Sequence, residues 1–440
     1  MNAHQSMYEQ KRMSAQQAAA LLPERGNISA AFFAGMPVAL LEAVSQAASL
    51  GQYEELSFYY MHSTPHMADT LLNPKTAAVV RPRPFYMGPA ERALVKTCLE
   101  QGHDKLLAYM PGNFSQVPRL MAEVIGIDTF MLRVSPMDEH GYFSLGVTGA
   151  YSQQVMRHCR QIIVEVNEHM PRTFGDSLLH ISDVTALTEC HQPLDALTLR
   201  APTDTDRAIG QHILGLIDDR ACVQFGIGGV PNVIAQMLTS HKDLGVHSEL
   251  LADGLMELMK SGAVTNRYKK TNPYKTVFNV AMGSQDLYDF IDDNPSIECF
   301  GADYVNDPYV IAQNDQMISV NAFIEIDLLG QVDAEVLMNR QFSAPGGQLD
   351  FVRGATLSKG GKSFLASTAT AAHGKVSRIV PRLSSVTTDP RAEVQYVATE
   401  FGLCNLQGKS TSERARALIG IAAPEFQAEL TAQAKNQGLI

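Results

Sequence analysis

The sequence lacks the features that mark several large classes of protein. No apolar run in its 440 residues reaches the roughly 18 residues that a membrane-spanning helix needs. The N-terminus has no apolar signal-peptide stretch, so we expect a cytoplasmic protein with no membrane partner. A basic face is missing too, because 46 acidic residues outnumber 35 basic ones and the net charge is -11. That balance argues against a nucleic-acid partner.

Cysteine is scarce and scattered along the chain. No two cysteines form a Cys-x-x-Cys pair, and all six lie far apart, at positions 98, 159, 190, 222, 299 and 404. This spacing predicts reduced, buried thiols. It indicates neither a disulfide framework nor a zinc site, and we expect no metal.

What the sequence does contain is an alternation of strand patterns with helical patterns. Residues 161–167, 221–229 and 318–330 are rich in Val, Ile and Phe, as strands are. Residues 230–240 and 253–262 place apolar residues three and four apart, as helices do. Strands that alternate with helices predict an α/β fold with mostly parallel sheets.

A weak internal repeat is visible at two places. Residues 32–44 (FFAGMPVALLEAV) and 226–238 (GIGGVPNVIAQML) both carry Gly-x-Pro followed by an apolar helix pattern. So short a match also arises by chance. Gly226 and Gly228 of the second copy are phenylalanine and alanine in the first, so only the second copy keeps a bare backbone.

The repeat and the chain length together favour two domains. A chain of 440 residues is too long for one ordinary core. The segment 190–205 is poor in strand residues and rich in turn residues. We therefore predict two related α/β domains, 1–195 and 196–440.

The stretch FGIGGVPN (225–232) places three glycines between a predicted strand and a predicted helix. Free N–H groups at a helix start favour an anion or a developing oxyanion. Residue 231 is proline, so the Gly-x-Gly-x-x-Gly pattern of a dinucleotide site is absent. A tight turn without a ligand explains the pattern about as well.

Two further glycine pairs invite close approach to the backbone. Gly346-Gly347 lies in SAPGGQLDFVRGA. Gly360-Gly361-Lys362 lies in SKGGKS, which is not a Walker sequence because Thr356 takes the place of its first glycine. A backbone nest beside a lysine suits a phosphate-bearing ligand, and a solvated turn is the alternative.

Two acidic or amide-bearing segments complete the candidates. Alternation along residues 319–328 predicts that Asn321, Phe323, Glu325 and Asp327 share one strand face, which either meets water or lines a pocket. Glu249 stands where a strand appears to end, just before the helix at 253. An ordinary glutamate, with a pKa of about 4.3, is ionised at neutral pH and can act as a nucleophile without a general base. A helix-entry carboxylate is the default interpretation.

The motifs of this chain resemble those of the acetyl-CoA hydrolase/transferase family. They occur in the same order as in that family and extend over nearly the whole chain. The resemblance is greatest to its 4-hydroxybutyrate and butyrate:acetate CoA-transferases, which are class I enzymes. The stretches that carry it are SPMDEHGYFSLG, EVNEHMPRTFGDSLLHISDVTALTE, FGIGGVPN, HSELLADGLMELM, GGQLDFVRGA, SKGGKS and VQYVATEFGLCNLQGKSTSERARALI.

This resemblance implies two CoA-transferase-type α/β domains with the active site between them. It implies that Glu249 is the nucleophile and forms an acyl anhydride and then a glutamyl-CoA thioester, while Asn321 polarises the thioester carbonyl. Coenzyme A enters as an acyl-CoA, without a metal, and acetate or another short-chain carboxylate is the acceptor. A homodimer is expected. The implied CoA contacts are Gly226, Ile227, Gly228, Gly229, Val230, Gly346, Gly347, Gly360, Gly361 and Lys362.

The sequence leaves three alternatives open. An acyl-CoA hydrolase would use the same fold with water as the acceptor. A non-catalytic protein that binds CoA or another metabolite would tolerate the loss of Glu249. A sugar-phosphate isomerase of similar architecture would have no need of two CoA-loop stretches. Phe323-Ile324 departs from the smaller or apolar residues usual in the family, which leaves the acyl-chain length open.

Overall fold

The computed structural model describes residues 3–197, 201–226 and 228–440. The chain folds into two compact units. The first consists of Met1–Leu197 and Asn279–Tyr304, and the second of Thr198–Phe278 and Val305–Ile440. A segment from the later half of the sequence thus belongs to the first unit, whereas the contiguous domains 1–195 and 196–440 stay a prediction. In the described part of the chain, no helix has both the length and the apolar character needed to cross a membrane.

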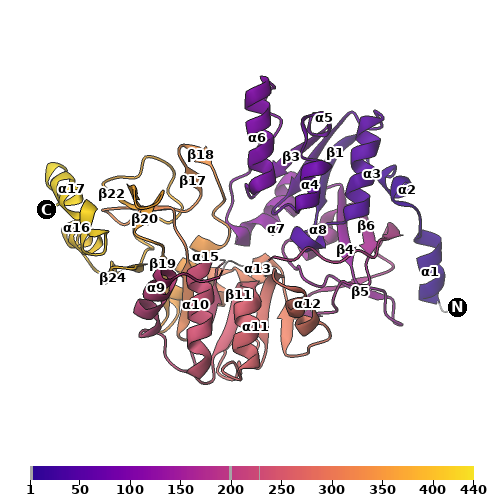
Figure 1. Cartoon of the computed structure of the whole chain (residues 1–440). Coiled ribbons are helices and arrows are strands. Elements are labelled where there is room, and N and C mark those ends of the chain that lie inside the picture. Colours follow the sequence, from indigo (N-terminus) through magenta and orange to yellow (C-terminus); the bar gives the residue numbers. More distant parts are fainter. Residues whose placement is uncertain (1–2, 198–200, 227) are drawn as a thin grey trace. The chain divides into compact units, whose positions relative to one another are not determined.

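The first unit is built on a six-stranded sheet with the order β3-β2-β1-β4-β6-β9, and every neighbouring pair runs parallel (Figure 1). Its strands are β1 (Arg25–Ala30), β2 (Glu55–Tyr60), β3 (Val80–Pro84), β4 (Thr129–Val134), β5 (Tyr142–Ser144), β6 (Gln161–Val166), β7 (Phe174–Gly175), β8 (Leu178–His180), β9 (Ala186–Glu189) and β13 (Ile297–Cys299). The pairs β5–β8 and β7–β13 lie apart from this sheet.

Helices cover the sheet of the first unit. Leu40, Leu41 and Val44 of α3 are fully buried and join the same apolar cluster as Ile28 of β1 and Leu56 of β2. The helices are α1 (Ala3–Lys11), α2 (Ala15–Ala19), α3 (Val38–Ser49), α4 (Pro65–Asp69), α5 (Pro74–Ala77), α6 (Pro89–Gln101), α7 (Val117–Arg119), α8 (Ser152–His158) and α12 (Gln285–Ile291), with short turns η1 (Phe33–Gly35), η2 (Phe114–Gln116) and η3 (Leu120–Ile125).

The second unit has a sheet in the order β24-β23-β19-β14-β10-β11, in which only the pair β23–β24 is antiparallel among the pairings described. Its strands are β10 (Cys222–Phe225), β11 (Gly245–Leu251), β14 (Met317–Asn321), β15 (Glu325–Asp327), β16 (Val332–Asp333), β17 (Val336–Leu337), β18 (Arg340–Gln341), β19 (Lys362–Ala366), β20 (Thr370–Ala371), β21 (Val376–Ser377), β22 (Ile379–Val380), β23 (Tyr396–Thr399) and β24 (Gly402–Asn405). The chain passes between the units in β12 (Thr276–Ala281) and α13 (Ala302–Val305).

Helix α10 packs against both α9 and α11 beside this sheet (Figure 1). The helices predicted over 230–240 and 253–262 are confirmed as α10, extended by the turn η4, and α11. The helices of the unit are α9 (Asp204–Leu214), α10 (Gly229–Met237), α11 (Asp253–Lys260), α14 (Pro308–Ala312), α15 (Gln348–Leu357), α16 (Thr411–Gly420) and α17 (Pro424–Asn436), with η4 (Leu238–Ser240).

The single strand predicted over 318–330 is wrong. The chain leaves the main sheet after Asn321, at the end of β14, and Glu325 begins β15 in a separate three-stranded sheet with β16 and β22. Phe323, between the two, is buried in the apolar cluster of the C-terminal helices. Two consecutive strands preserved the alternation of polar and apolar residues, so the pattern did not reveal the break.

The parallel strands bring three candidate segments to one edge of the second sheet. Gly226 follows β10, Asn321 ends β14, and Glu249 lies near the end of β11. In the register between β10 and β14, Phe225 is beside Val320, so Gly226 and Asn321 follow at the same level. The carboxyl edge of such a sheet is where α/β proteins bind ligands.

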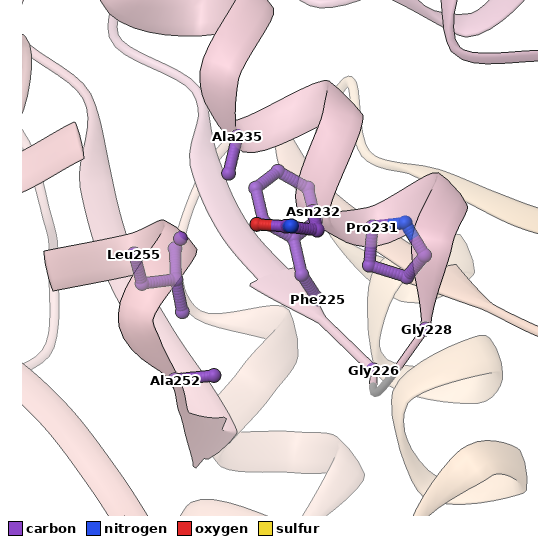
Figure 2. A pocket seen from close by; sticks show the side chains of 9 residues that line it. Phe225, Gly226, Gly228, Pro231, Asn232, Ala235, Ala252 and Leu255 are labelled. Atoms are coloured by element: carbon purple, nitrogen blue, oxygen red, sulfur yellow. The ribbon is translucent and has the colours of Figure 1, made fainter. Parts of the chain in front are cut away.

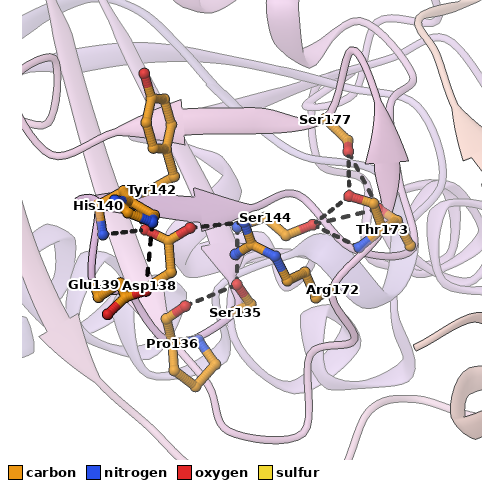
Figure 3. Close-up of polar contacts among 10 residues, drawn as sticks. All are labelled: Ser135, Pro136, Asp138, Glu139, His140, Tyr142, Ser144, Arg172, Thr173 and Ser177. Carbon is orange, nitrogen blue, oxygen red and sulfur yellow. Dashed lines mark hydrogen bonds and ion pairs between the residues drawn. The ribbon is translucent and has the colours of Figure 1, made fainter. Parts of the chain in front are cut away.

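Two stretches of the first unit that resemble family motifs fold against each other (Figure 3). Asp138 accepts hydrogen bonds from the backbone N–H groups of His140 and Tyr142, each at 2.9 Å, and Arg172 Nη2 donates to it at 2.7 Å. The hydroxyl of Ser144 accepts from the Thr173 N–H at 3.0 Å. These contacts assign a structural role to the two stretches.

A buried ion pair occupies the start of α3. Arg133 of β4 and Glu165 of β6 are direct neighbours in the sheet register, and their side chains are 1% and 0% exposed. Arg133 Nε donates to Glu165 Oε1 at 3.2 Å. The backbone N–H groups of Val38 and Leu40, in the first turn of α3, donate to the same carboxylate at 3.0 and 3.1 Å. The first half of the chain thus satisfies this helix start with its own glutamate.

Removing the carboxylate should therefore destabilise the first unit strongly. In Glu165→Ala, Arg133 becomes a buried charge without its partner, and α3 loses an acceptor at its start. We expect the free energy of unfolding, measured by urea denaturation, to fall by about 3–5 kcal/mol. The control is Glu9→Ala, which breaks the exposed pair with Arg12 and should change little. Equal effects of the two substitutions would contradict the structural role of the pair.

Candidate active site

Glu249 lies on strand β11, on the face that it shares with Gly245 and His247. It comes two residues before the last residue of the strand, Leu251, rather than at the strand end that the sequence suggested. The residue as a whole keeps partial exposure to solvent, but its carboxyl group is buried, as are the neighbours Ser248 and Leu250. A strand residue has a fixed backbone, so the position of this carboxylate is well determined.

Two neutral N–H donors hold the carboxylate. Asn306 Nδ2 donates to Glu249 Oε2 at 2.6 Å, and the backbone N–H of Gly347 also hydrogen-bonds to the carboxylate. A Cβ added at Gly347 would overlap both the Glu249 carboxylate and the Asn306 amide. Gly347 is therefore glycine because the carboxylate approaches its backbone so closely.

Both donors come from the starts of helices that pack on each other. Asn306 precedes Asp307, the N-cap of α14, and Gly347 is the N-cap of α15. Helices α14 and α15 are in contact, and a Cβ on Gly354 of α15 would meet Ile311 of α14. The packing of one helix on the other thus sets the distance between the two donors.

Burial raises the pKa of Glu249 to about 7. The Asp350 carboxylate nearby also raises this pKa, while the hydrogen bonds from Asn306 and Gly347 lower it. The carboxyl group of Glu249 therefore ionises less readily than the free glutamate considered from the sequence. A carboxylate that is poorly stabilised by its surroundings is a stronger nucleophile than an exposed one.

His247 fixes the segment that carries Asn306. Its Nε2 donates to the Val305 carbonyl oxygen at 2.8 Å, and the ring is fully buried. Burial, and then the nearby Lys269 ammonium, lower the pKa of His247 to about 3, so the ring is neutral at pH 7. One face of β11 therefore contacts residues 305 and 306 in succession, through His247 and Glu249.

Neither Asn306 nor His247 belongs to a sequence motif that predicts a site residue. Asn306 lies in DYVNDP, which matches no catalytic motif and reads as a helix cap. His247 carried one usable indication, its two-residue spacing from Glu249 on a predicted strand.

The glycine loop lies at the carboxyl edge beside Asn321. The Gly226 N–H donates to the Val320 carbonyl at 3.0 Å, and a Cβ on Gly226 would lie 3.2 Å from Asn321 Oδ1. Gly228 is the N-cap of α10, and a Cβ on Gly229 would overlap the Asp206 carboxylate. Val230 is buried in the first turn. The predicted CoA contact at Ile227 lies outside the described residues.

Asn321 forms a reciprocal amide pair. Gln224 Nε2 donates to Asn321 Oδ1 at 3.2 Å, and Asn321 Nδ2 donates to Gln224 Oε1 at 3.3 Å. Both side chains are buried. No hydrogen bond joins Asn321 to Glu249 among the described residues, so its predicted role at the thioester carbonyl stays a prediction.

A small hollow lies between the starts of α10 and α11 (Figure 2). It encloses about 270 Å³ including its open mouth, and its walls are mostly apolar, from Phe225, Pro231, Ala235, Ala252 and Leu255, with Gly226, Gly228, Asn232 and Gly254. Asn232 lies close to the other helix, since a Cβ on Gly254 would be 2.8 Å from its Oδ1. Its interior holds only about 20 Å³, about the room of one water molecule, so the hollow is a small feature between the two helix starts and not a ligand cavity.

The structure does not bring Gly360, Gly361 and Lys362 to the same edge. Lys362 begins β19 beside Ile318, whereas Leu365, later in that strand, pairs with Asn321. Lys362 Nζ donates to the Leu216 carbonyl at 2.9 Å and lies 3.7 Å from Asp218. These residues therefore lie at the amino edge of the sheet, away from Glu249, and their predicted role as CoA contacts stays a prediction.

Comparisons with protein families give two matches. The acetyl-CoA hydrolase/transferase N-terminal domain matches residues 1–197, and the C-terminal domain of the same family matches residues 283–434.

Two characterised proteins are similar over most of the chain. A succinyl-CoA:cyclohexane-1-carboxylate CoA transferase of Geobacter metallireducens is 38% identical and covers 100% of this chain and 98% of its own length. A 4-hydroxybutyrate coenzyme A transferase of Clostridium kluyveri is 44% identical over 75% of this chain and 77% of its own length.

Two solved structures share the fold. RipA from Yersinia pestis superimposes with a TM-score of 0.97 at 43% identity over 100% of both chains. A 4-hydroxybutyrate CoA-transferase from Porphyromonas gingivalis gives a TM-score of 0.83 at 32% identity, over 98% of this chain and 99% of that one. The predicted α/β fold of the CoA-transferase type, with mostly parallel sheets, is confirmed.

The raised pKa of Glu249 predicts a pH-dependent cost in stability. Below about pH 4.5 both the folded and the unfolded protein hold this proton. As the pH rises towards 7, the unfolded chain releases it first, so stability falls and the cost is complete above about pH 7. Glu249→Gln does not titrate. We therefore expect a higher thermal unfolding midpoint than wild type at pH 8, with the difference shrinking towards pH 5. A constant difference across pH would show that Glu249 has an ordinary pKa.

Proposed function

The chain belongs to the acetyl-CoA hydrolase/transferase family, and on that premise we propose that it transfers CoA through a covalent intermediate on Glu249. It is a CoA-transferase, as its relatives are over most of its length. One observation carries the proposed chemistry: Glu249 presents a carboxylate with a pKa of about 7, oriented by Asn306 and the Gly347 N–H, at the carboxyl edge of a parallel sheet.

In the first half-reaction, a Glu249 carboxylate oxygen attacks the thioester carbonyl of an acyl-CoA. The C–S bond breaks, CoA leaves as a thiolate, and an acyl–glutamyl anhydride remains. The thiolate then attacks the glutamyl carbonyl of the anhydride. The donor acid leaves as its carboxylate, and a glutamyl-CoA thioester is formed.

The second half-reaction reverses these steps with a different acid. The acceptor carboxylate attacks the glutamyl-CoA thioester, and the released thiolate attacks the acceptor's acyl carbon in the new anhydride. Glu249 is regenerated as a carboxylate. An activated acyl bond is kept throughout, so the exchange needs no ATP, and water must be kept from the anhydride.

The two donors have a consistent role in this scheme. Before reaction, Asn306 and the Gly347 N–H orient the carboxylate oxygen. Once the carboxylate has become an anhydride or thioester, the same N–H groups face the glutamyl carbonyl oxygen, where negative charge develops during the next attack. Donors fixed by helix packing need no reorganisation at that moment.

Coenzyme A is the proposed ligand of the carboxyl edge. The glycine loop supplies Gly226, Gly228, Gly229 and Val230 beside the start of α10. A small, mostly apolar hollow lies between this loop and the start of α11. Ile227 completes the loop in sequence.

The relatives define the class of substrate. We propose a short-chain acyl-CoA, such as 4-hydroxybutyryl- or butyryl-CoA, as the donor and acetate as an acceptor, as the names of 4-hydroxybutyrate and butyryl-CoA:acetate CoA-transferases suggest. A cytoplasmic location and a homodimer also carry over as proposals, to be tested by cell fractionation and by light scattering.

The covalent intermediate is directly testable. When the enzyme meets butyryl-CoA without an acceptor acid, the released carboxylate diffuses away and the glutamyl-CoA thioester accumulates. Intact-protein mass should rise by one CoA, and peptide mapping should place the adduct on Glu249. Acetate should then discharge the adduct much faster than buffer alone.

Two results would count against this scheme. Turnover in rapid-quench experiments without any adduct would remove the covalent intermediate, and an adduct on another carboxylate would reassign the nucleophile. Discharge at equal rates in buffer and in acetate would indicate a hydrolase instead. Glu249→Gln is the control, since it should fold and form no adduct.

The two asparagines test the two proposed polar contacts. Asn306→Ala removes a donor from the Glu249 carboxylate, so we expect kcat to fall by about a hundred- to a thousand-fold with little change in KM for acyl-CoA. Asn321→Ala removes the amide predicted to act at the thioester carbonyl, and that role requires a comparable fall in kcat. A lower thermal unfolding midpoint without a selective loss of kcat would instead assign Asn321 only to its amide pair with Gln224.

A further inference from the structure

A second buried carboxyl group lies near the site, on Asp389. The side chain is fully buried, and Gln348 Nε2 donates to its Oδ2 at 2.6 Å. The other oxygen, Oδ1, is buried and has no hydrogen-bond partner among the described residues. A half-satisfied buried carboxyl group reduces stability, so its presence calls for an explanation.

The backbone of Asp389 is anchored to the small sheet of the second unit. Its N–H donates to the Val332 carbonyl at 3.1 Å, and the Val332 N–H donates back to the Asp389 carbonyl at 3.1 Å. Val332 belongs to β16, which pairs with β15. Asp389 is therefore a fixed point from which a neighbouring segment can be held.

The segment held from this point adjoins the nucleophile. Gln348 is the first residue of α15 and follows Gly347, whose N–H bonds to the Glu249 carboxylate. Gly346 and Gly347 have no side chains of their own to anchor the turn, and Gly346 has φ +54°. Gln348 is thus the first side chain after the glycine pair that can fix its position.

We propose that Asp389 is a positioning residue for the nucleophile: through Gln348 it fixes the Gly347 N–H against the Glu249 carboxylate. This inference rests on the proposed function for its kinetic consequence. In this proposal, a continuous series of contacts connects the small sheet to the reacting oxygen. The series runs through Asp389, Gln348, Gly347 and Glu249.

The surroundings of Asp389 favour this role over one in stability alone. Burial raises the pKa of Asp389 to about 7, the Gln348 hydrogen bond lowers it, and the charges of Glu335 and Glu393 raise it further. An apolar residue would fill this place without these costs. Aspartate supplies an acceptor for the Gln348 amide, whereas an apolar residue supplies none.

The same helix offers a matched control. Arg353, further along α15, donates from Nη2 to Glu393 Oε1 at 3.0 Å. This bond also joins α15 to the segment that carries Asp389, but more than one helical turn away from Gly347. Arg353→Met therefore breaks a comparable link without releasing the glycine turn.

The tether is tested from both ends, with Asp389→Ala and Gln348→Met. Each should lower kcat by about ten- to a hundred-fold with little change in KM for acyl-CoA. The rate of adduct formation falls at low pH, where Glu249 is protonated. In both variants this acid limb of the pH–rate profile should move to higher pH, because the loss of an N–H donor raises the pKa of Glu249. Asp389→Asn keeps an acceptor oxygen and should retain most of the activity. Arg353→Met should leave the acid limb in place.

A double variant and a readout without turnover complete the experiment. Asp389→Ala with Gln348→Met should be no slower than either single variant, because both remove one contact. The pKa of Glu249 is also measured without turnover. In each variant, the free energy of unfolding is compared with that of the same variant carrying Glu249→Gln, as a function of pH. The pKa obtained from this difference should show the same upward shift.

The outcomes separate the tether from the proposed function. Absence of any adduct in wild type would overturn the function, and the stability readout would still decide the tether. If the pKa of Glu249 in Gln348→Met equals that in Arg353→Met and wild type, the positioning role is overturned. Gln348 is only half-buried, so this variant should fold even if Asp389→Ala does not.

Discussion

The site depends on a carboxylate that is oriented by neutral N–H donors. Among the described residues, Asn306 and Gly347 supply these donors to Glu249, and the charged group that acts on it is another acid, Asp350. A cation in their place would orient the carboxylate equally well, but it would also stabilise the charge and lower the pKa. Neutral donors fix the geometry while leaving the oxygen reactive, and the arrangement of α14 and α15 follows from that requirement.

Strand β11 acts as the reference for this geometry. Its pleat sends His247 and Glu249 to the same face, and the two side chains hold Val305, the last residue of α13, and the next residue, Asn306. Because His247 is buried and neutral, it contributes a directional hydrogen bond without a charge that would alter Glu249. Positioning and electrostatics are thus assigned to different residues of one strand.

Local patterns predicted local structure well. The spacing of apolar residues predicted α10 and α11. The glycines before α10 indicated a helix that begins without a side-chain cap. The break after Asn321 escaped detection because β14 and β15 continue one alternation in two sheets. Asn306 and the amino-edge position of Lys362 could not be predicted for a different reason. They depend on helix packing and on strand register, which join residues far apart in the sequence.

The buried pair at the start of α3 has a consequence for how the chain can change. Glu165 accepts from the start of α3, in the segment that the short sequence match pairs with the glycine loop after β10; the matched Gly-x-Pro precedes α3 but lies inside α10. Loss of either Glu165 or Arg133 alone leaves a buried charge without its partner. Opening this helix start to a ligand therefore requires two simultaneous substitutions. Stepwise mutation passes through a less stable intermediate, so this difference between the two halves of the chain is costly to reverse.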